Sequence, residues 1–231
     1  MRYFNDLRTI QSSGPYPMPQ AELTVLNGQA AVNAYLDTGY PKEAILEGEA
    51  LRNGYLYHIR AGSSLKMKKA RAIKVLVLGD YLSSSTIKLL NLLEATTPHT
   101  STLVTYTVKP HPFYMVKSTD YPSLSLDVVV DPLGEILGDF DIAYSGNETS
   151  AAVDAYLAGL KVVVMLDDAK LNLSPLRGQS DVRFVSTPEE LAEALQMGKQ
   201  HTVNRPDRND FFFLDPELPR WRKLLSPVSS T

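Results

Sequence analysis

KVLVLGD, residues 74–80, is the stretch of sequence on which the fold depends. Its apolar residues are consecutive, which is typical of a central strand that is buried on both faces of a parallel sheet. The stretch ends at Gly79-Asp80. SSSTIKLLNLLEA (83–95) follows with helical spacing and with serines available as helix caps. A buried strand followed by a helix begins the pattern that the rest of the chain repeats.

The same alternation of strand and helix continues to residue 198. Further strands are predicted at 102–112, 126–131, 141–146, 161–166 and 181–187, and further helices at 132–140, 149–159 and 188–198. Pro110 and Pro112 force the chain out of the sheet after the second strand, because proline has no N–H to donate. The alternation predicts a doubly wound parallel α/β sheet, which is a Rossmann-like fold.

Two segments flank this sheet. The first is predicted to be a small α/β extension, with strands in 22–28 and near 43–46 and helices over 29–39 and near 48–57. Asn27-Gly28 is typical of a turn that needs a positive φ. The other segment, FFFLDPELPRWRKLL (211–225), is rich in aromatic residues and is predicted to end in a helix. We expect it to pack on the flank of the sheet or on a missing neighbouring lobe.

The sequence therefore predicts four segments: an N-terminal extension (1–60), a connector (61–73), a Rossmann-like domain (74–200) and an aromatic tail with a helix (201–231). The connector carries a basic cluster of Lys66, Lys68, Lys69 and Arg71. We interpret this cluster as a solvated linker, and a patch that faces phosphate or a membrane is the alternative.

Composition excludes several classes of function. The chain has 231 residues, 44% apolar and 21% charged, which is ordinary for a globular protein with a core. The net charge of −3 gives no indication of bulk nucleic-acid binding. The absence of cysteine excludes disulfides, thiolate-zinc sites and cysteine nucleophiles. No apolar run is long enough to span a bilayer and MRYFNDLRTI is too polar for a signal peptide, so we expect a cytoplasmic location.

Candidate ligand-binding residues follow the predicted strands, because ligands of open parallel sheets bind outside the carboxyl ends of the strands. The loops at these ends contribute Gly79, Asp80, Ser83 and Ser84, then Lys109, His111 and Pro112, and finally Ser145, Gly146, Asn147, Glu148, Thr149 and Ser150. Asp167-Asp168 follows a later strand, and we interpret it as solvated loop acids rather than as contacts to a ribose or a metal.

The Ser145–Ser150 loop joins a glycine and small hydroxyl residues to the start of a predicted helix. A helix N-terminus offers unpaired N–H groups and the positive end of a dipole, so it attracts phosphate. Ser145, Thr149 and Ser150 would add hydroxyl donors to such a site. Plain N-capping by Asn147 or Thr149 explains the same residues equally well.

Lys109-Pro110-His111-Pro112 places a lysine and a histidine at the end of the second strand. The prolines fix the loop, so the imidazole needs little ordering when a ligand binds. Such a group suits a donor to phosphate, either to bind it or to stabilise it as a leaving group. A surface histidine in a proline-rich turn is the alternative, and the nearby serine loop favours the phosphate role.

Other motifs point to no further chemistry. The serines at 83–85 lack both Gly-rich phosphate-loop patterns, and helix capping explains them. His58, His99 and His201 have no metal-ligand spacing with one another, so no metal site is predicted. The chain has no G-x-S-x-G elbow, which argues against an α/β-hydrolase.

The motifs resemble the carboxyl-terminal, donor-binding lobe of GT-B-fold bacterial surface-carbohydrate glycosyltransferases. This group includes sialyl-, polysialyl- and Kdo-transferase-like proteins and glycerophosphate polymerases. The resemblance is carried by Lys109-Pro110-His111-Pro112, by Ser145–Ala152 with Asp154-Ala155, and by Gly159–Val164. Residues 25–56 also resemble the segment that precedes this lobe in surface-carbohydrate biosynthesis proteins.

The resemblance implies a nucleotide-sugar donor, linked to CMP or UDP, as the substrate, and no separate cofactor. His111 would contact the donor phosphate, with Lys109 beside it and with Ser145, Thr149 and Ser150 completing the cup. A carbohydrate or lipid-linked acceptor is implied as the partner, with peripheral association at the inner membrane.

The resemblance also leaves other functions open. The chain has no Asp-Asp-Gly or Glu-Asp-Gly motif of the sialyltransferases and no acceptor-binding lobe, which supplies the catalytic base in GT-B enzymes. We therefore expect a fragment or a reduced relative, and no catalysis by this chain alone. A sugar-nucleotide epimerase of the same architecture and a non-catalytic binding or assembly protein are the alternatives.

Overall fold

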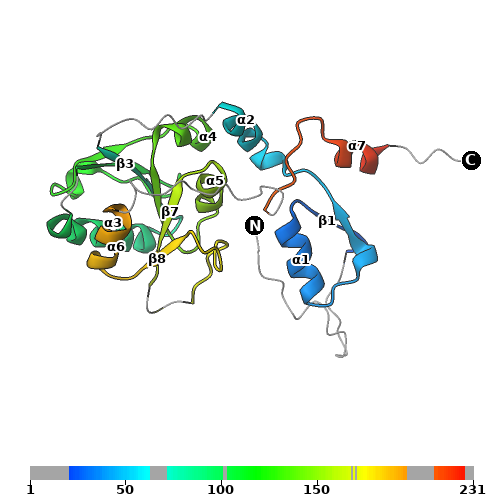
Figure 1. The fold of residues 1–231 in the computed structure, drawn as a ribbon, viewed down its shortest axis with the longest axis horizontal. Coiled ribbons are helices and arrows are strands. Elements are labelled where there is room, and N and C mark those ends of the chain that lie inside the picture. The colour runs from blue at the N-terminus through cyan, green and yellow to red at the C-terminus, as the bar shows by residue number, and fades with distance from the viewer. Residues whose placement is uncertain are drawn as a thin grey trace, which may run out of the picture. The chain divides into compact units, whose positions relative to one another are not determined.

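The computed structural model describes residues 21–62, 72–100, 103–167, 169, 171–196 and 211–226. It divides into two compact units (Figure 1). The smaller unit comprises Met1–Ala61 together with Pro206–Thr231, and the larger unit comprises Gly62–Arg205. The basic cluster in the predicted connector lies outside the described residues. No helix among the described residues is both long enough and apolar enough to cross a membrane.

The larger unit is built on a six-stranded parallel sheet with the order β5-β4-β3-β6-β7-β8. Its strands are β3 (Ile73–Leu78), β4 (Val104–Lys109), β5 (Leu126–Val128), β6 (Ile142–Gly146), β7 (Lys161–Met165) and β8 (Arg183–Val185). The first strand, β3, therefore lies in the middle: the chain moves outward through β4 and β5 and then returns to β6 on the other side of β3. This arrangement confirms the predicted parallel α/β class.

Helices cover both faces of this sheet. They are α3 (Ser83–Thr96), α4 (Leu133–Ile136), α5 (Ala151–Leu157) and α6 (Pro188–Gln196), with short 3₁₀ turns η4 (Thr97–His99), η5 (Ser118–Asp120) and η6 (Leu137–Asp139). Helices α3 and α6 lie on one face and α5 on the other (Figure 1). The predicted helices are present, and β4, β5 and β8 are shorter than predicted.

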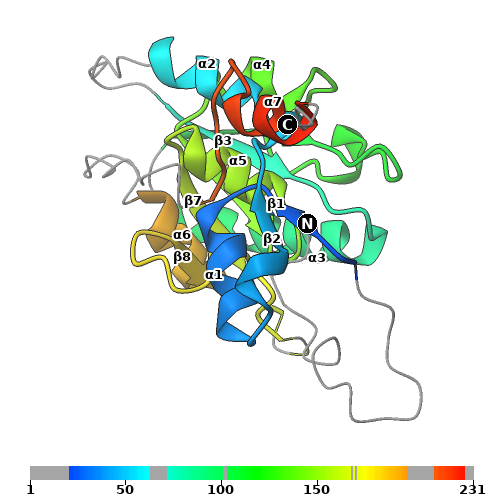
Figure 2. The same ribbon diagram turned by 90° about the vertical axis from the view of Figure 1, so that its right-hand side faces the viewer.

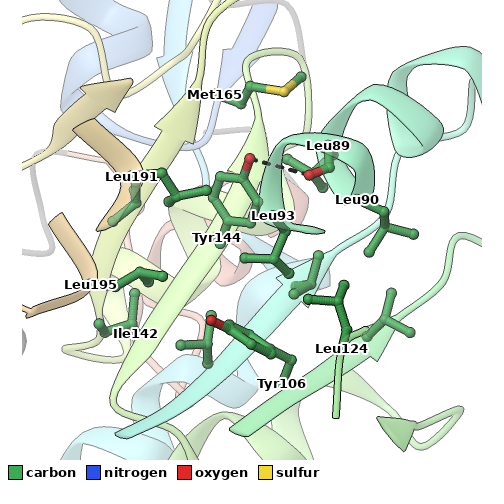
Figure 3. Close-up of a cluster of buried hydrophobic side chains, with 14 of the residues drawn as sticks. Leu89, Leu90, Leu93, Tyr106, Leu124, Ile142, Tyr144, Met165, Leu191 and Leu195 are labelled. Atoms are coloured by element: carbon green, nitrogen blue, oxygen red, sulfur yellow. Dashed lines mark hydrogen bonds between the residues drawn. The ribbon is translucent and has the colours of Figure 1, made fainter. Parts of the chain in front are cut away.

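The main core lies between the sheet and helices α3 and α6 (Figure 3). Val75 and Val77 of β3 are fully buried in it, and Leu76, between them, is fully buried as well, as expected for a strand covered on both faces. Tyr144 of β6 is also fully buried, and its hydroxyl donates to the carbonyl of Leu89 at 3.3 Å. Burial raises the pKa of Tyr144, so this hydroxyl stays protonated and keeps its role as a donor.

The smaller unit contains two parallel strands, β1 and β2. Its elements are β1 (Thr24–Leu26), α1 (Gln29–Asp37), η2 (Lys42–Ala44), β2 (Ile45–Glu47), η3 (Leu51–Asn53), α7 (Pro219–Leu225) and most of α2 (Tyr55–Gly62). Figures 1 and 2 both show α1 beside the strand pair. Helix α2 begins later than predicted. Ala50 has a non-helical ψ of 81°, its N–H donates to the carbonyl of Phe213 at 2.9 Å, and the chain then forms η3 before α2 starts.

The aromatic tail belongs to this smaller unit. Phe211, Phe212 and Phe213 are each buried, and Phe213 packs against Leu26 and Val32. The N–H of Phe213 also donates to the carbonyl of Asn27 at 2.9 Å. The tail therefore packs on the N-terminal extension, a partner that the sequence did not predict.

Gly28 lies where the tail approaches this extension most closely. Its φ is −176°, so the predicted turn with a positive φ at Asn27-Gly28 is wrong. A Cβ atom at residue 28 would lie 1.7 Å from the carbonyl oxygen of Phe211 and 2.4 Å from its carbonyl carbon. The glycine is needed because the backbone of the tail occupies the space of a side chain.

The Glu49 carboxylate holds the C-terminal helix α7. Glu49 is only 2% exposed, and it accepts hydrogen bonds from the backbone N–H groups of Arg220 at 3.0 Å and Trp221 at 3.2 Å. The Arg220 guanidinium donates to the same carboxylate at 3.2 Å. Leu218, at the N-cap of α7, has no polar side chain to offer. Glu49 therefore caps a helix that lies 171 residues away in the sequence.

These contacts predict a stability that depends on pH. Burial opposes ionisation of Glu49, but the Arg220 and Trp221 N–H groups and the Arg220 guanidinium outweigh it and hold the pKa of Glu49 below its usual range. A carboxyl with a lowered folded-state pKa stabilises fully above its unfolded pKa, about 4.3, and loses that contribution as the pH falls through the folded value. We expect wild type to lose more stability on acidification than Glu49→Gln. Urea unfolding monitored by Trp221 emission measures the free energy of unfolding of both proteins at each pH. Equal pH dependence in the two proteins would contradict the role of Glu49.

Candidate functional site

Three loops meet at one edge of the larger sheet. Strands β4, β3 and β6 are neighbours and run parallel, so the loops that follow them share the carboxyl edge of the sheet. The crossing point of the chain lies between β3 and β6, and this is where open α/β sheets bind ligands. The predicted residues after these strands are therefore at the expected edge.

Gly79 allows the β4 loop to lie against β3. The N–H of Gly79 donates to the carbonyl of Lys109 at 3.0 Å. A Cβ atom at residue 79 would lie 3.2 Å from the N atom of His111 and 3.2 Å from the Cα atom of Pro110. These are backbone atoms, which move less easily than a flexible side chain. A side chain at residue 79 would push the His111 loop away from β3, so glycine is needed for the two to lie together.

Asp80 organises the turn between β3 and α3. It is 4% exposed, and its Oδ1 atom accepts a hydrogen bond from the N–H of Leu82 at 3.1 Å. The hydroxyl of Thr86 accepts from the N–H of Asp80 at 2.9 Å and donates to its carbonyl at 3.2 Å. The Oδ2 atom of Asp80 lies 3.7 Å from the position that a Cβ at Gly146 would take, so the carboxylate reaches the β6 loop.

The N-terminus of α3 follows this turn. Ser83 and Ser84 are exposed in its first turn. The predicted capping by serine is wrong, because the N-cap residue is Leu82, which makes no side-chain hydrogen bond to the helix. The serines begin one residue too late to act as caps. The positive end of a 14-residue helix therefore lies at this edge without an acceptor from its own cap residue.

His111 begins a tight turn after β4. Its carbonyl accepts a hydrogen bond from the N–H of Tyr114 at 2.9 Å, which closes the turn around Pro112 and Phe113. The N–H of Phe113 also donates to the Nδ1 atom of His111 at 3.3 Å. Since Nδ1 accepts, the neutral imidazole carries its proton on Nε2. His111 can therefore donate a hydrogen bond from Nε2.

Lys109 contacts the neighbouring loop on the outer side of β4. Its Nζ atom donates to the carbonyl of Val130 at 3.0 Å, just after β5. The lysine of the predicted motif is thus engaged with the backbone after β5, the strand on the side of β4 away from β3.

Ser145 lies inside the larger unit. It is fully buried on β6, with its Cα opposite those of Leu78 and Val164. Its hydroxyl oxygen has no hydrogen-bond partner among the described residues. In this structure the Ser145 hydroxyl therefore does not form part of the surface, where a phosphate would bind.

The rest of this loop is held by its own hydrogen bonds. The Asn147 side chain donates to the carbonyl of Leu171 at 3.0 Å, so it does not cap the helix that follows. The hydroxyl oxygen of Thr149 accepts a hydrogen bond from the N–H of Ala151, the first residue of α5, at 3.3 Å, although Thr149 is not the N-cap residue. Ser150 is the N-cap residue of α5, a helix of only seven residues, and it is half-buried.

The acidic residues after β7 have a structural contact. Asp167 pairs with Lys88 of α3 at 2.6 Å, and its side chain is 15% exposed, so the interpretation as a solvated loop acid is wrong for this residue. Asp168 lies outside the described residues. No group of three or more His, Cys, Asp or Glu residues is arranged to hold a metal ion within the part of the chain that the structure describes.

Two aromatic residues beside His111 were not predicted as site residues. The ring of Tyr81 lies 6.4 Å from the imidazole and that of Phe113 lies 5.2 Å from it, measured between centroids. Both are strongly exposed, at 54% for Tyr81 and 86% for Phe113. Tyr81 directly follows Gly79-Asp80 and Phe113 directly follows His111-Pro112, and these positions in the sequence could have indicated them.

Comparisons with known proteins support the fold. No protein-family model matches the chain, and no curated protein matches it by sequence. The UDP-GlcNAc 2-epimerase of Methanocaldococcus jannaschii, in complex with UDP-GlcNAc and UDP, is similar with a TM-score of 0.52 and 10% identity, over 84% of this chain and 58% of that chain. At this identity the likeness shows the fold alone, and it agrees with the predicted Rossmann-like architecture.

Two other solved structures are similar at lower TM-scores. The wall teichoic acid polymerase TagF gives 0.46 at 12% identity, over 78% of this chain and 50% of that chain. The β-Kdo 2,7-transferase KpsC of Thermosulfurimonas dismutans gives 0.39 at 15% identity, over 64% and 54%. This chain therefore spans 50 to 58% of the length of these three proteins.

Proposed function

We propose that the larger unit binds the phosphates of a nucleotide-sugar, linked to CMP or UDP, at the carboxyl edge of the sheet, where the loops after β4 and β3 meet. In this proposal the chain is the donor-binding half of a glycosyltransferase of surface-polysaccharide biosynthesis, such as that of capsule or lipopolysaccharide. One observation carries the proposal: the turn that starts α3 and the His111 turn meet at Gly79, whose N–H donates to the carbonyl of Lys109 and where a side chain would contact backbone atoms of Pro110 and His111.

Two groups at this edge favour an anionic ligand, against the opposing charge of the buried Asp80 carboxylate. Helix α3 directs the N–H groups of its first turn and the positive end of its dipole toward the edge. His111 adds a hydrogen-bond donor at Nε2, on a turn that prolines and hydrogen bonds hold in place. Donors fixed before the ligand arrives stabilise negative charge without reorganisation.

These donors fit the chemistry of glycosyl transfer. In that reaction the bond between the anomeric carbon and the phosphate oxygen breaks, and negative charge develops on the departing phosphate. His111 and the α3 amides would stabilise this charge. The acceptor, a carbohydrate or lipid-linked hydroxyl, loses its proton to a base that the proposal assigns to a second lobe. A lipid-linked acceptor would bring the enzyme to the membrane surface.

Nucleotide binding is the first prediction to test. We expect UDP or CMP to raise the melting temperature of wild type, because a ligand present at 100 times its Kd stabilises by about 2.7 kcal/mol. His111→Ala is expected to lose most of this response. His58→Ala removes an exposed imidazole in the smaller unit and serves as the matched control. Differential scanning fluorimetry with UDP, CDP, CMP and GDP measures all three proteins.

The possible outcomes separate the candidate functions. An unchanged shift in His111→Ala would remove the phosphate role of this residue. No response of wild type to any of the nucleotides would favour the non-catalytic assembly protein. If nucleotide binds, incubation with the nucleotide-sugar distinguishes the epimerase from the glycosyltransferase. An epimerase converts the sugar without releasing nucleotide. A transferase releases nucleotide when the acceptor and the second lobe are supplied.

A further inference from the structure

Two exposed aromatic rings flank the candidate phosphate-binding imidazole. Phe113 is 86% exposed and Tyr81 is 54% exposed, and their ring centroids lie 5.2 Å and 6.4 Å from that of His111. A folded protein gains stability by burying such rings, so large apolar side chains gathered at one exposed place mark a binding surface. These rings come from different loops, one after β3 and one after β4, which meet at Gly79.

The turn that carries Phe113 is held rigidly. Pro110 before it is buried, and the N–H of Tyr114 closes it onto the carbonyl of His111. The backbone N–H of Phe113 is bonded to the Nδ1 atom of His111, which fixes the ring-bearing residue and the imidazole relative to each other. Because the backbone that carries the ring is already fixed, only the side-chain torsions of Phe113 have to be ordered when a ligand packs on it.

We infer that Phe113 and Tyr81 stack the nucleobase of the ligand whose phosphate His111 binds. The inference rests on the proposed function and deepens it, because it makes the base a determinant of affinity. Every nucleobase has a planar π-face, and protein aromatic rings at nucleotide sites stack on it. A nucleotide carries its base and its phosphate on one ribose, which matches rings beside an anion donor. A pyrophosphate alone would leave both rings in water.

Phe113→Leu tests this inference by isothermal titration of the full chain. The substitution is expected to weaken UDP binding about tenfold or more, the effect of losing one stacked base. Binding of inorganic pyrophosphate, which has no base, is expected to stay unchanged. Phe113→Trp is expected to restore UDP binding, and its added indole should change in emission with UDP but not with pyrophosphate. Wild type, whose single tryptophan is Trp221, supplies the background signal.

Leu103→Ala is the matched control. Leu103 is 73% exposed and precedes β4 at its amino end, opposite the candidate site. This variant should bind UDP as wild type does. An equal melting temperature for wild type and Phe113→Leu verifies that the fold is intact.

The results separate the inference from the proposed function. UDP binding by Phe113→Leu at wild-type affinity overturns the inference, and the proposed function survives if His111→Ala still loses UDP. An equal loss of UDP and pyrophosphate by Phe113→Leu also overturns it, because the ring would then act through His111 alone. Failure of wild type to bind UDP, CMP or pyrophosphate overturns both.

Discussion

Replacing Glu49 with alanine is expected to destabilise the smaller unit by about 2 to 3 kcal/mol. The substitution removes the acceptor of the Arg220 and Trp221 N–H groups and the partner of the Arg220 guanidinium in one step. The loss of a helix cap alone costs about 1 kcal/mol, and the loss of a buried charge partner adds to it. We expect a total loss below the highest values for buried ion pairs. The Arg220 side chain is 35% exposed, so water can hydrate its guanidinium once the Glu49 carboxylate is removed.

Trp221 provides a local measurement of this effect. It is the only tryptophan in the sequence, and its indole N–H donates to the carbonyl of Glu49 at 2.8 Å. Urea unfolding monitored by Trp221 emission therefore reports on the smaller unit, whereas far-ultraviolet circular dichroism also records the six-stranded sheet. Glu49→Ala should shift the emission transition to lower urea and leave the unfolding of the larger unit in place.

Glu47→Ala is the matched control for this prediction. Glu47 also contacts Arg220, at 3.4 Å from its Nε atom, but its side chain is 46% exposed. Exposed ion pairs contribute little, so this variant should change the free energy of unfolding by about 0.5 kcal/mol or less. Equal effects of Glu47→Ala and Glu49→Ala would mean that charge attraction to Arg220, rather than capping of α7, holds the helix.

The larger unit could be predicted from the sequence because its signals are local. Residues 74–80 form a continuous apolar run, and continuous runs indicate strands that are covered on both faces. Proline ends β4 at Pro110, and Gly159, with a φ of +94°, ends the α5 segment as expected. Each of these signals lies within a few residues of the element that it defines.

The smaller unit depends on contacts that no sequence window contains. Glu49 and Arg220 are 171 residues apart, yet the pair decides where α7 begins. Ala50 is non-helical, with a ψ of 81°, where its N–H pairs with the distant Phe213 carbonyl, and the predicted helix near 48–57 starts only at Tyr55. Tertiary hydrogen bonds here override local helix propensity.

The sequence indicated that the candidate residues follow the carboxyl ends of the strands, as they do in the structure, but not which way their side chains point. His111 lies on a turn beside β3, as the His-Pro motif indicates. Ser145 was predicted in the loop after β6, yet it lies within β6, and every residue of this strand is buried because the sheet is covered on both faces. Gly79 was predicted to contact the ligand. The backbone of the β4 loop lies so close to it that a glycine is needed here whether or not a ligand binds. Side-chain direction and loop approach are properties of the folded sheet, so the motif alone cannot give them.

Gly28→Ala is expected to be the most damaging small substitution in the smaller unit. A methyl group at this position would lie 1.7 Å from the carbonyl oxygen of Phe211 and 2.4 Å from the carbonyl carbon. The backbone of the tail has to move to relieve this overlap. Such a movement strains the hydrogen bond from the Phe213 N–H to the Asn27 carbonyl and the packing of the buried Phe213 ring. We expect a loss of about 3 kcal/mol, the upper end for overpacking in a filled core.

Gly54→Ala separates this steric effect from a general cost of replacing glycine. At Gly54 the nearest atom to an added Cβ is the carbonyl oxygen of Leu51 at 3.5 Å, an ordinary contact. Neither glycine has a positive φ, so backbone strain does not distinguish the two positions. Gly54→Ala should be neutral or stabilise by a few tenths of a kcal/mol, since alanine restricts the unfolded chain. Emission of Trp221 in urea measures both variants. A Gly28→Ala protein as stable as Gly54→Ala would mean that the tail does not lie against residue 28.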